Sequence, residues 1–471
     1  MSTGEKHLHG DRPAYLSACN RLTRFRPPAQ HCQNMNDKST PVPRIIGLDC
    51  HPDSFTAAVL EGTTPSNALT QKIFNKVPMG YLPKWAQDHT RPQDLLVLEA
   101  SGNSFQVVRT LAAGGRKALV LESCQMGKLK EAHANNDKIS AVRIAKAYLA
   151  GTAKEVWVPD LKTQERRDWF HAHNKAVKRS TQTRNRLLSY LSDNGVRFTA
   201  ARPLEDGDPE RIWQSRPWSA RQKQVIEGLL MDRRHAEEQR QHWASLMSQE
   251  VLTDPQLLSL VRLCGVRDKV AFALGAIIGD IARFESPKKL VKYFGLDPAF
   301  DDSGEGTWQG GIAGHGRKDV RSLLIESAHS ILRSSHPLSR WGKKLLARKG
   351  EVKLVVAALA RRLTVAVWYL LLGRWTPLEE VDLLTRQKVG KIIKNIGRGG
   401  LKKMGKTRPQ LREEVFQSLQ HGRTYQLDLE KKMPPRKPNK VDPLTHQDYP
   451  LTRTRNGTRK EKVAASLLRS K

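Results

Sequence analysis

Between residues 44 and 158, short apolar runs alternate with longer stretches that place an apolar residue at every third or fourth position. The runs are typical of strands, and the longer stretches are typical of helices that bury one face. We expect five strands, over residues 45–49, 54–60, 71–75, 95–98 and 118–121. Two helices are expected over 105–113 and 138–150, each followed by a glycine that can end it. The pattern therefore predicts an α/β sheet in which the last two strands are parallel.

The rest of the chain is expected to be mainly helical. Residues 159–254 are strongly charged, and their apolar spacing is compatible with a pair of coiled-coil helices or with a plain helical linker. A compact helical domain is predicted for 255–378. Residues 1–43 and 379–471 are polar and basic, so we expect a disordered arm at one end and a flexible tail at the other.

Charge is the most unusual feature of the composition. The chain carries 80 Lys and Arg against 47 Asp and Glu, a formal net charge of +33. An excess of this size attracts a polyanion, most often nucleic acid, although a ribosomal-type binder or a protein on an anionic membrane would fit it too. The most apolar helical stretch, 352–372, contains Arg361 and Arg362, so no membrane span is expected. The five cysteines have no CxxC spacing, which indicates neither a disulfide framework nor a zinc ribbon.

Three carboxylates lie where predicted strands end or a predicted helix begins. Asp49 ends the first strand, Glu99 ends the fourth, and Asp137 begins the second helix. Carboxylates that converge at one sheet edge can hold hard divalent ions, which prefer oxygen ligands. Two such ions can activate the attacking oxygen and stabilise the leaving one in phosphodiester chemistry. Each acid also has a structural interpretation, since an Asp after a strand is a common turn residue and Asp137 could be a helix N-cap.

The segment 263–271 is expected to form a turn between two helices. Gly265 would let backbone N–H groups approach a phosphate, and Arg267 would add a charged contact. A plain turn that packs on Ala271 and Leu274 explains the same residues equally well.

A serine and a basic group follow in the same region. On sequence alone Ser303, which precedes a glycine, is a turn residue, and a serine hydroxyl needs activation before it can attack phosphorus. Arg317, Lys318 and Arg321 could neutralise a phosphate there, or could simply form a solvated helix face.

Four segments together resemble the DEDD-type insertion-sequence transposases and recombinases, the insertion-sequence 110/116/902 family. Three are acidic segments and the fourth, with gaps, contains the serine: Ile46-Gly47-Leu48-Asp49-Cys50-His51, Leu98-Glu99-Ala100-Ser101-Gly102, 136–145 and 263–321. The resemblance covers about residues 43–375 in two blocks, joined by a helical stretch that the family also carries.

The resemblance implies a RuvC-like N-terminal domain of the ribonuclease-H kind, which the predicted strand order also matches. It implies that Asp49, Glu99 and Asp137 bind metal and that a fourth acid follows one helical turn after Asp137. This chain has Ser140 at that position, a neutral hydroxyl that binds magnesium far more weakly than a carboxylate does. The resemblance also gives Ser303 the role of nucleophile.

The function implied by the resemblance is that of a DNA transposase, which cuts and rejoins an insertion sequence through a phosphoserine intermediate. The expected cofactor is Mg²⁺ or Mn²⁺. The expected partners are DNA and a structured guide RNA encoded by the element. A homo-oligomer, a dimer or a tetramer, is expected to combine the acids of one subunit with the serine of another, in the cytoplasm of a bacterium or archaeon near the nucleoid.

Two alternatives stay open from the residues. A metal-dependent nuclease or junction resolvase would use the acids with water and would not need the serine. A decayed derivative would keep nucleic-acid binding and lose cleavage, and Ser140 at the fourth acid position is the reason to consider it.

Overall fold

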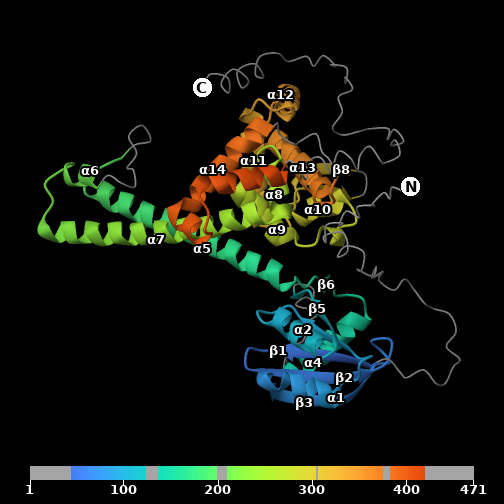
Figure 1. Ribbon diagram of the computed structural model, residues 1–471. Helices are drawn as coiled ribbons and strands as arrows, with labels where there is room; N and C mark the ends of the chain where they lie inside the picture. The colour runs from blue at the N-terminus through green and yellow to red at the C-terminus, as the bar shows by residue number, and fades with distance from the viewer. Residues whose placement is uncertain (1–43, 124–135, 199–208, 304–305, 375–381, 420–471) are drawn as a thin grey trace, which may run out of the picture. The chain divides into compact units, whose positions relative to one another are not determined.

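The computed structural model describes residues 44–123, 136–198, 209–303, 306–374 and 382–419 (Figure 1). These residues belong to two compact units, and the chain passes from the first to the second between Val158 and Pro159. The finer division expected within the second unit, at residues 254 and 378, stays a prediction.

The first unit is built on one six-stranded sheet with the order β3-β2-β1-β4-β5-β6. The strands are β1 (Arg44–Cys50), β2 (Ser54–Glu61), β3 (Leu69–Pro78), β4 (Leu95–Glu99), β5 (Lys117–Leu121) and β6 (Glu155–Val156). β1, β2 and β3 pair antiparallel, whereas β1, β4 and β5 pair parallel. All five predicted strands are confirmed, together with the parallel pairing of the last two. The sixth, β6, pairs antiparallel with β5 and was not predicted.

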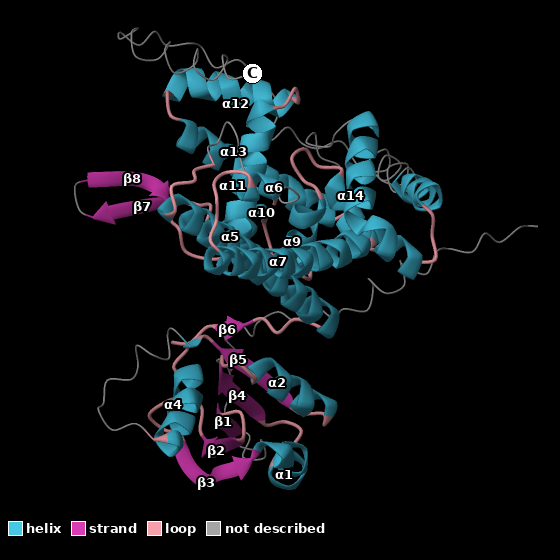
Figure 2. Ribbon diagram, turned by 90° about the vertical axis from the view of Figure 1, so that its left-hand side faces the viewer, coloured by secondary structure: helices cyan, strands magenta, loops and turns pink. Residues whose placement is uncertain are grey.

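Helices cover both faces of this sheet (Figure 2). The helices are α1 (Leu82–His89), which follows the short η3 (Met79–Tyr81), α2 (Ser104–Ala113) and α4 (Asp137–Leu149). Successive strand residues point to opposite faces, so one set of side chains, including Leu48 and Leu98, packs with α1 and α2. The other set, including Ile45 and Val97, packs with Ala141 and its neighbours on α4. Both predicted helices are therefore present, and α1 is an addition.

Gly47 lets α4 lie directly against β1. A Cβ atom at this position would lie 1.9 Å from the carbonyl oxygen of Ala141 on α4, a distance at which two atoms cannot coexist. Only a residue without a side chain fits here. The start of α4 is therefore held beside the end of β1.

The second unit begins with two long helices that run antiparallel, α5 (Leu161–Asp193) and α7 (Ala220–Thr253), with the short α6 (Glu210–Trp213) between them in the chain (Figure 1). Arg166 of α5 links one end of the pair to α7. It is almost fully buried and donates to Glu250 of α7 over 2.6 Å and to Asp254, the C-cap of α7. Asp254 also caps the next helix, because it accepts from the backbone of Leu257 over 3.1 Å. A single carboxylate thus joins three helices.

The remaining elements of the second unit are mostly helices around one large core. They are α8 (Pro255–Val261), α9 (Asp268–Ile278), η4 (Ile281–Arg283), α10 (Pro287–Tyr293), α11 (Lys318–Arg333), α12 (Pro337–Lys349), α13 (Val352–Leu371) and α14 (Asp382–Lys403), with a hairpin of β7 (Pro298–Ser303) and β8 (Gly306–Ile312). Within the described ranges, α13 is the one helix long and apolar enough to cross a membrane. It packs against α10, α11 and α12 in this unit.

Part of the expected basic tail is ordered helix. Residues 382–403 form α14, and residues 408–419 are helical as well, so the flexible tail predicted for 379–471 is wrong over 382–419. The reason is an apolar stripe that recurs at helical spacing and is buried in the core: Val389, Ile392, Ile393, Ile396, Leu401, Leu411, Val415 and Phe416. The high density of lysine in this segment concealed the stripe. Residues 1–43 and 420–471 lie outside the described residues.

Replacing Gly47 with alanine should destabilise the first unit by about 1–3 kcal/mol, because the added methyl forces α4 away from β1. Gly80→Ala is the matched control, since a Cβ there meets no atom within 4 Å. Urea unfolding followed by hydrogen exchange in peptides from β1 and α4 measures the difference. If the two variants are equally stable, α4 does not depend on this close approach.

Candidate functional site

Two of the predicted acids lie side by side at one edge of the sheet. Leu48 of β1 and Leu98 of β4 are partners in the parallel ladder, and Asp49 and Glu99 are the next residue of each strand. Because both leucines face α1 and α2, the alternation of a strand turns the two acids toward the opposite face, where α4 lies. The sheet therefore brings Asp49 and Glu99 to the same edge and the same face.

The start of α4 supplies the third acid. The N-cap of this helix is Asn136, whose side chain accepts from the backbone N–H of Ile139 over 2.9 Å. The alternative in which Asp137 caps the helix is therefore wrong, since its neighbour already does so. Asp137 is the first helical residue, half-exposed, and its carboxylate is not used for capping.

Asp49 and Asp137 form a cluster with a histidine that the sequence analysis did not single out. One ligand atom from each of Asp49, His51 and Asp137 lies within 4.8 Å of the others. The imidazole Nε2 of His51 is 3.7 Å from Oδ1 of Asp137. Glu99, at the neighbouring strand end, is not a member of this cluster. A signal for His51 was present in the sequence, because this histidine follows directly after a largely buried strand that ends in Asp49-Cys50.

Hydrogen bonds fix the loop that carries His51. Asn103, which precedes α2, donates from Nδ2 to the backbone oxygen of His51 over 2.9 Å. The Oγ of Ser101 donates in turn to Oδ1 of Asn103 over 3.0 Å. The loop after β4 therefore holds the loop after β1, and the two strand ends that carry Asp49 and Glu99 are tied together.

The donors in the cluster suit a divalent cation. Two carboxylates and an imidazole are ordinary ligands, and a cation about 2.1 Å from each would place opposite ligand atoms about 4.2 Å apart. That separation is within the 4.8 Å that the three side chains span. Ser140, the residue at the predicted fourth acid position, is half-buried one helical turn after Asp137. Its hydroxyl is a weaker ligand than a carboxylate.

Cys50 lies between Asp49 and His51 and stays neutral. Burial, followed by the negative charge of Asp49, raises the pKa of its thiol to about 12. At neutral pH the residue is therefore a thiol rather than a thiolate, so it adds no negative charge to the cluster.

Ser303 lies at the tip of a hairpin. It is the last residue of β7 and pairs in register with Gly306, the first residue of β8. Asp301 and Asp302 precede it on the same strand and pair with Trp308 and Thr307. A turn was expected at Ser303, whereas the structure places this residue at the end of a strand.

The predicted phosphate-binding turn makes packing contacts. Gly265 has a φ of +76°, a backbone conformation suited to glycine, and a Cβ there would meet Ile331 of α11 at 2.8 Å. Arg267 donates from Nε to Asp268 over 3.0 Å. Both residues thus have structural contacts, and their role toward phosphate stays a prediction.

The three predicted cations near α11 have different surroundings. Arg317 donates from Nη2 to Asp319 over 2.7 Å, and Arg321 donates to the backbone oxygen of Phe294 over 3.3 Å. Lys318 is exposed as the first residue of α11. The two arginines therefore brace the segment between α10 and α11, and nucleic-acid binding by all three stays a prediction.

Residues 259–342 match the family described as the transposase IS116/IS110/IS902 family. This segment runs from α8 into α12 and contains the hairpin with Ser303. Three relatives extend the comparison beyond it. The transposase for insertion sequence element IS1111A of Coxiella burnetii is 25% identical over 282 residues, which are 59% of this chain and 77% of that protein.

The protein y4qE of Sinorhizobium fredii is 26% identical over 267 residues, or 56% of this chain, and the match spans only 64% of the relative's own length. The pilin gene-inverting protein of Moraxella lacunata is 24% identical over 192 residues, or 37% of this chain and 57% of that protein. The matched segment and these relatives agree on one assignment. The chain is similar to the IS116/IS110/IS902 transposase family over residues 259–342, and to transposases over a longer stretch.

Proposed function

We propose that the protein is a DNA transposase that cuts and rejoins the DNA of an insertion sequence. The observation that carries the proposal is that one chain combines the family segment 259–342 with a carboxylate cluster at a sheet edge. Relatives named as a transposase and as a gene-inverting protein support the same class of reaction, which is the rearrangement of DNA.

The first unit is proposed to be a RuvC-like domain of the ribonuclease-H kind. The sheet order β3-β2-β1-β4-β5, with three antiparallel strands followed by parallel ones, supports it. Asp49, Glu99 and Asp137 would hold Mg²⁺ or Mn²⁺, with His51 as a further ligand. When bound, such an ion polarises a phosphate oxygen and stabilises the charge that develops on the leaving oxygen. The residues of the chain position that ion and, through the half-exposed Asp137, leave its site accessible to a phosphodiester.

Ser303 is proposed to be the nucleophile. Its oxygen would attack the phosphorus, its proton would pass to a base, and the bond from phosphorus to one DNA oxygen would break. The product is a phosphodiester between serine and one DNA end, with a free hydroxyl on the other. Attack by a DNA hydroxyl on the same phosphorus would release the serine and rejoin the strand. The position of Ser303 at the last residue of β7, inside the segment that matches the transposase family, supports this role.

DNA and a guide RNA encoded by the element are the proposed partners, and the net charge of +33 supports contact with both. A dimer or tetramer is proposed, in which the acids of one subunit act with Ser303 of another. The proposed location is the cytoplasm of a bacterium or archaeon.

A junction resolvase that uses water is the second candidate, and the carboxylate cluster favours it because that cluster suits water-mediated hydrolysis equally well. A decayed nucleic-acid binder is the third, and the hydroxyl of Ser140 in place of a carboxylate favours it.

Replacing Ser303 with alanine should abolish both cleavage and the covalent adduct, because the attacking oxygen is lost. Labelled element ends incubated with protein, guide RNA and Mg²⁺ should give a slow, protease-sensitive band on a denaturing gel with the wild type. Ser335→Ala, at an exposed serine of the same segment, is the control and should keep the band. Cleavage by Ser303→Ala at the wild-type rate would establish the resolvase instead.

Replacing Ser140 with aspartate should lower the concentration of Mg²⁺ that gives half-maximal cleavage, by about tenfold if one added carboxylate contributes roughly 1.4 kcal/mol to metal binding. Ser140→Ala is the control and should leave that concentration close to the wild-type value. Asp49→Asn and Asp137→Asn should abolish cleavage in both backgrounds. Cleavage by Asp49→Asn at wild-type metal concentrations would mean that the acids are structural.

A further inference from the structure

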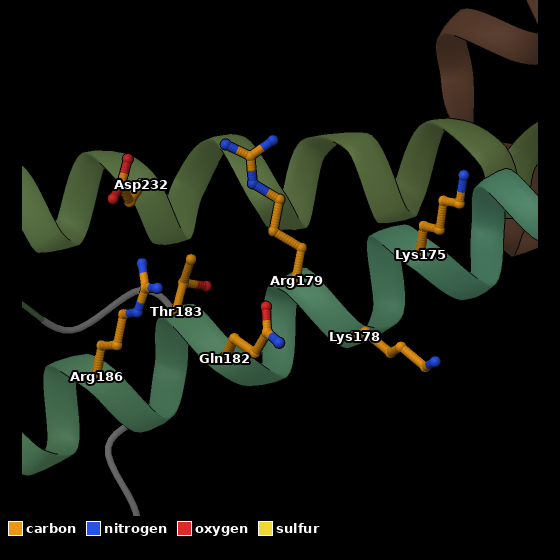
Figure 3. A pocket seen from close by; sticks show the side chains of 7 residues that line it. All are labelled: Lys175, Lys178, Arg179, Gln182, Thr183, Arg186 and Asp232. Atoms are coloured by element: carbon orange, nitrogen blue, oxygen red, sulfur yellow. The ribbon is translucent and has the colours of Figure 1, made fainter.

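A basic groove lies between α5 and α7, in the second unit. Its volume is about 410 Å³, and it is lined by six residues of α5 and one of α7 (Figure 3): Lys175, Lys178, Arg179, Gln182, Thr183, Arg186 and Asp232. The lining residues of α5 recur every three or four positions, so they share one face of the helix. From the first to the last they extend about 16 Å along the helix axis, at about 1.5 Å per residue.

The charged side chains of the groove are available to a ligand. All four cations and Asp232 are exposed, whereas Thr183 is buried in the groove floor, where its hydroxyl donates to the backbone oxygen of Ser180 over 3.1 Å. Arg179 and Arg186 extend from α5 toward α7, and Lys178 extends away from it at the rim (Figure 3).

The groove contains four cations and one carboxylate, whereas three other cations of the same helix pair have acid partners. At one end, Lys162 donates to Asp254 over 2.9 Å, beside the buried pair of Arg166 with the same acid. Arg240, on α7, donates from Nε to Glu237 over 2.8 Å. No acid occurs between residues 175 and 186 of α5.

Like charges one turn apart destabilise a helix by about 0.2–0.5 kcal/mol per pair, and Lys175 and Arg179 are such a pair. Beside the groove, burial and then the charge of Arg184 lower the pKa of Arg233 on α7. A cluster of cations that opposes helix stability, on a helix pair in which Lys162, Arg166 and Arg240 have acid partners, is the arrangement expected of a site for an anion supplied by a partner.

We propose that this groove binds the phosphodiester backbone of a nucleic acid. A groove about 16 Å long spans more than one phosphate of a nucleic-acid strand. Its cations can therefore meet neighbouring phosphates, and Gln182 can donate to a phosphate or a sugar. No base edge is recognised by such contacts, so the groove adds affinity without sequence preference. The inference shares with the proposed function only the identity of the partner, and it does not depend on metal or serine chemistry.

The test removes three groove cations and compares the result with the loss of three others. Lys175→Gln, Arg179→Gln and Arg186→Gln are combined in one variant, and Arg340→Gln, Lys343→Gln and Lys344→Gln, all exposed on α12, form the control with the same change in charge. Anisotropy titrations with a labelled DNA duplex and a labelled RNA hairpin are run without divalent metal, so that cleavage plays no part. Circular dichroism confirms that both variants keep their helices.

The groove variant should bind at least tenfold more weakly than the control variant. The slope of log affinity against log salt is negative, and with duplex DNA its magnitude should be smaller by about 2–3 in the groove variant than in the wild type. Each lost phosphate contact removes about 0.9 from that magnitude. Loss with both probes identifies a general backbone site, and loss with one alone identifies that nucleic acid as the occupant. If the groove variant binds both probes as tightly as the control variant does, the proposal is overturned.

A gain of affinity is the sharper test, because misfolding cannot mimic it. Asp232→Asn removes the one carboxylate of the groove and should strengthen binding about twofold or more at low salt. Glu326→Gln, at an exposed acid of α11, removes the same charge elsewhere and should have a smaller effect. An equal gain from both variants would assign the effect to net charge and not to the groove. The groove proposal and the serine chemistry can fail separately. If the groove variant loses affinity but the wild type forms no Ser303 adduct, the groove binds nucleic acid and only the proposed chemistry is wrong.

Discussion

The candidate metal centre depends on the close approach of α4 to β1 at Gly47. Asp49 belongs to the strand and Asp137 to the helix, so their carboxylates meet only because the backbones of the two elements nearly touch. Two carboxylates this close repel each other in the absence of a positive partner. The imidazole of His51 is 3.7 Å from Asp137, and a bound cation would offset the repulsion between the two carboxylates. The packing of the sheet thus brings together charges that are costly for the folded chain alone.

The sequence predicted much of the first unit because its signals are local. The five strands carry apolar runs, and Asp49, Glu99 and Asp137 stand at their ends or at a helix start, so the placing of the acids followed from the expected topology. The cap of α4 is Asn136, although the sequence also allowed Asp137. A choice between two adjacent capping residues depends on backbone angles, which the sequence pattern does not specify. His51 was missed because one histidine after a strand has no periodic signature.

The second unit was predicted less well, because its signals are tertiary. Residues 298–312 contain four glycines and only two β-branched residues, Thr307 and Ile312, so the sequence predicted a turn at Ser303 and not the strands β7 and β8. Pairing between the two strands, and not the propensity of either, makes this hairpin. In α14, apolar residues such as Ile392 and Ile396 are separated by lysines that suggest a solvated tail, and only the core against which they pack explains the helix.

The exposed cations between α5 and α7 tolerate substitution far better than Gly47 does. Gly47 is surrounded by backbone atoms, so nearly every substitution there would disturb the sheet that carries the acids. The cations that line the groove are exposed, and replacing them removes no core contact. If the groove binds a polyanion as proposed, mutation can adjust that affinity in small steps and leave the acidic cluster of the sheet unchanged. The affinity for nucleic acid and the geometry of the acids would then be able to change independently, and a protein engineer could tune binding at these exposed positions.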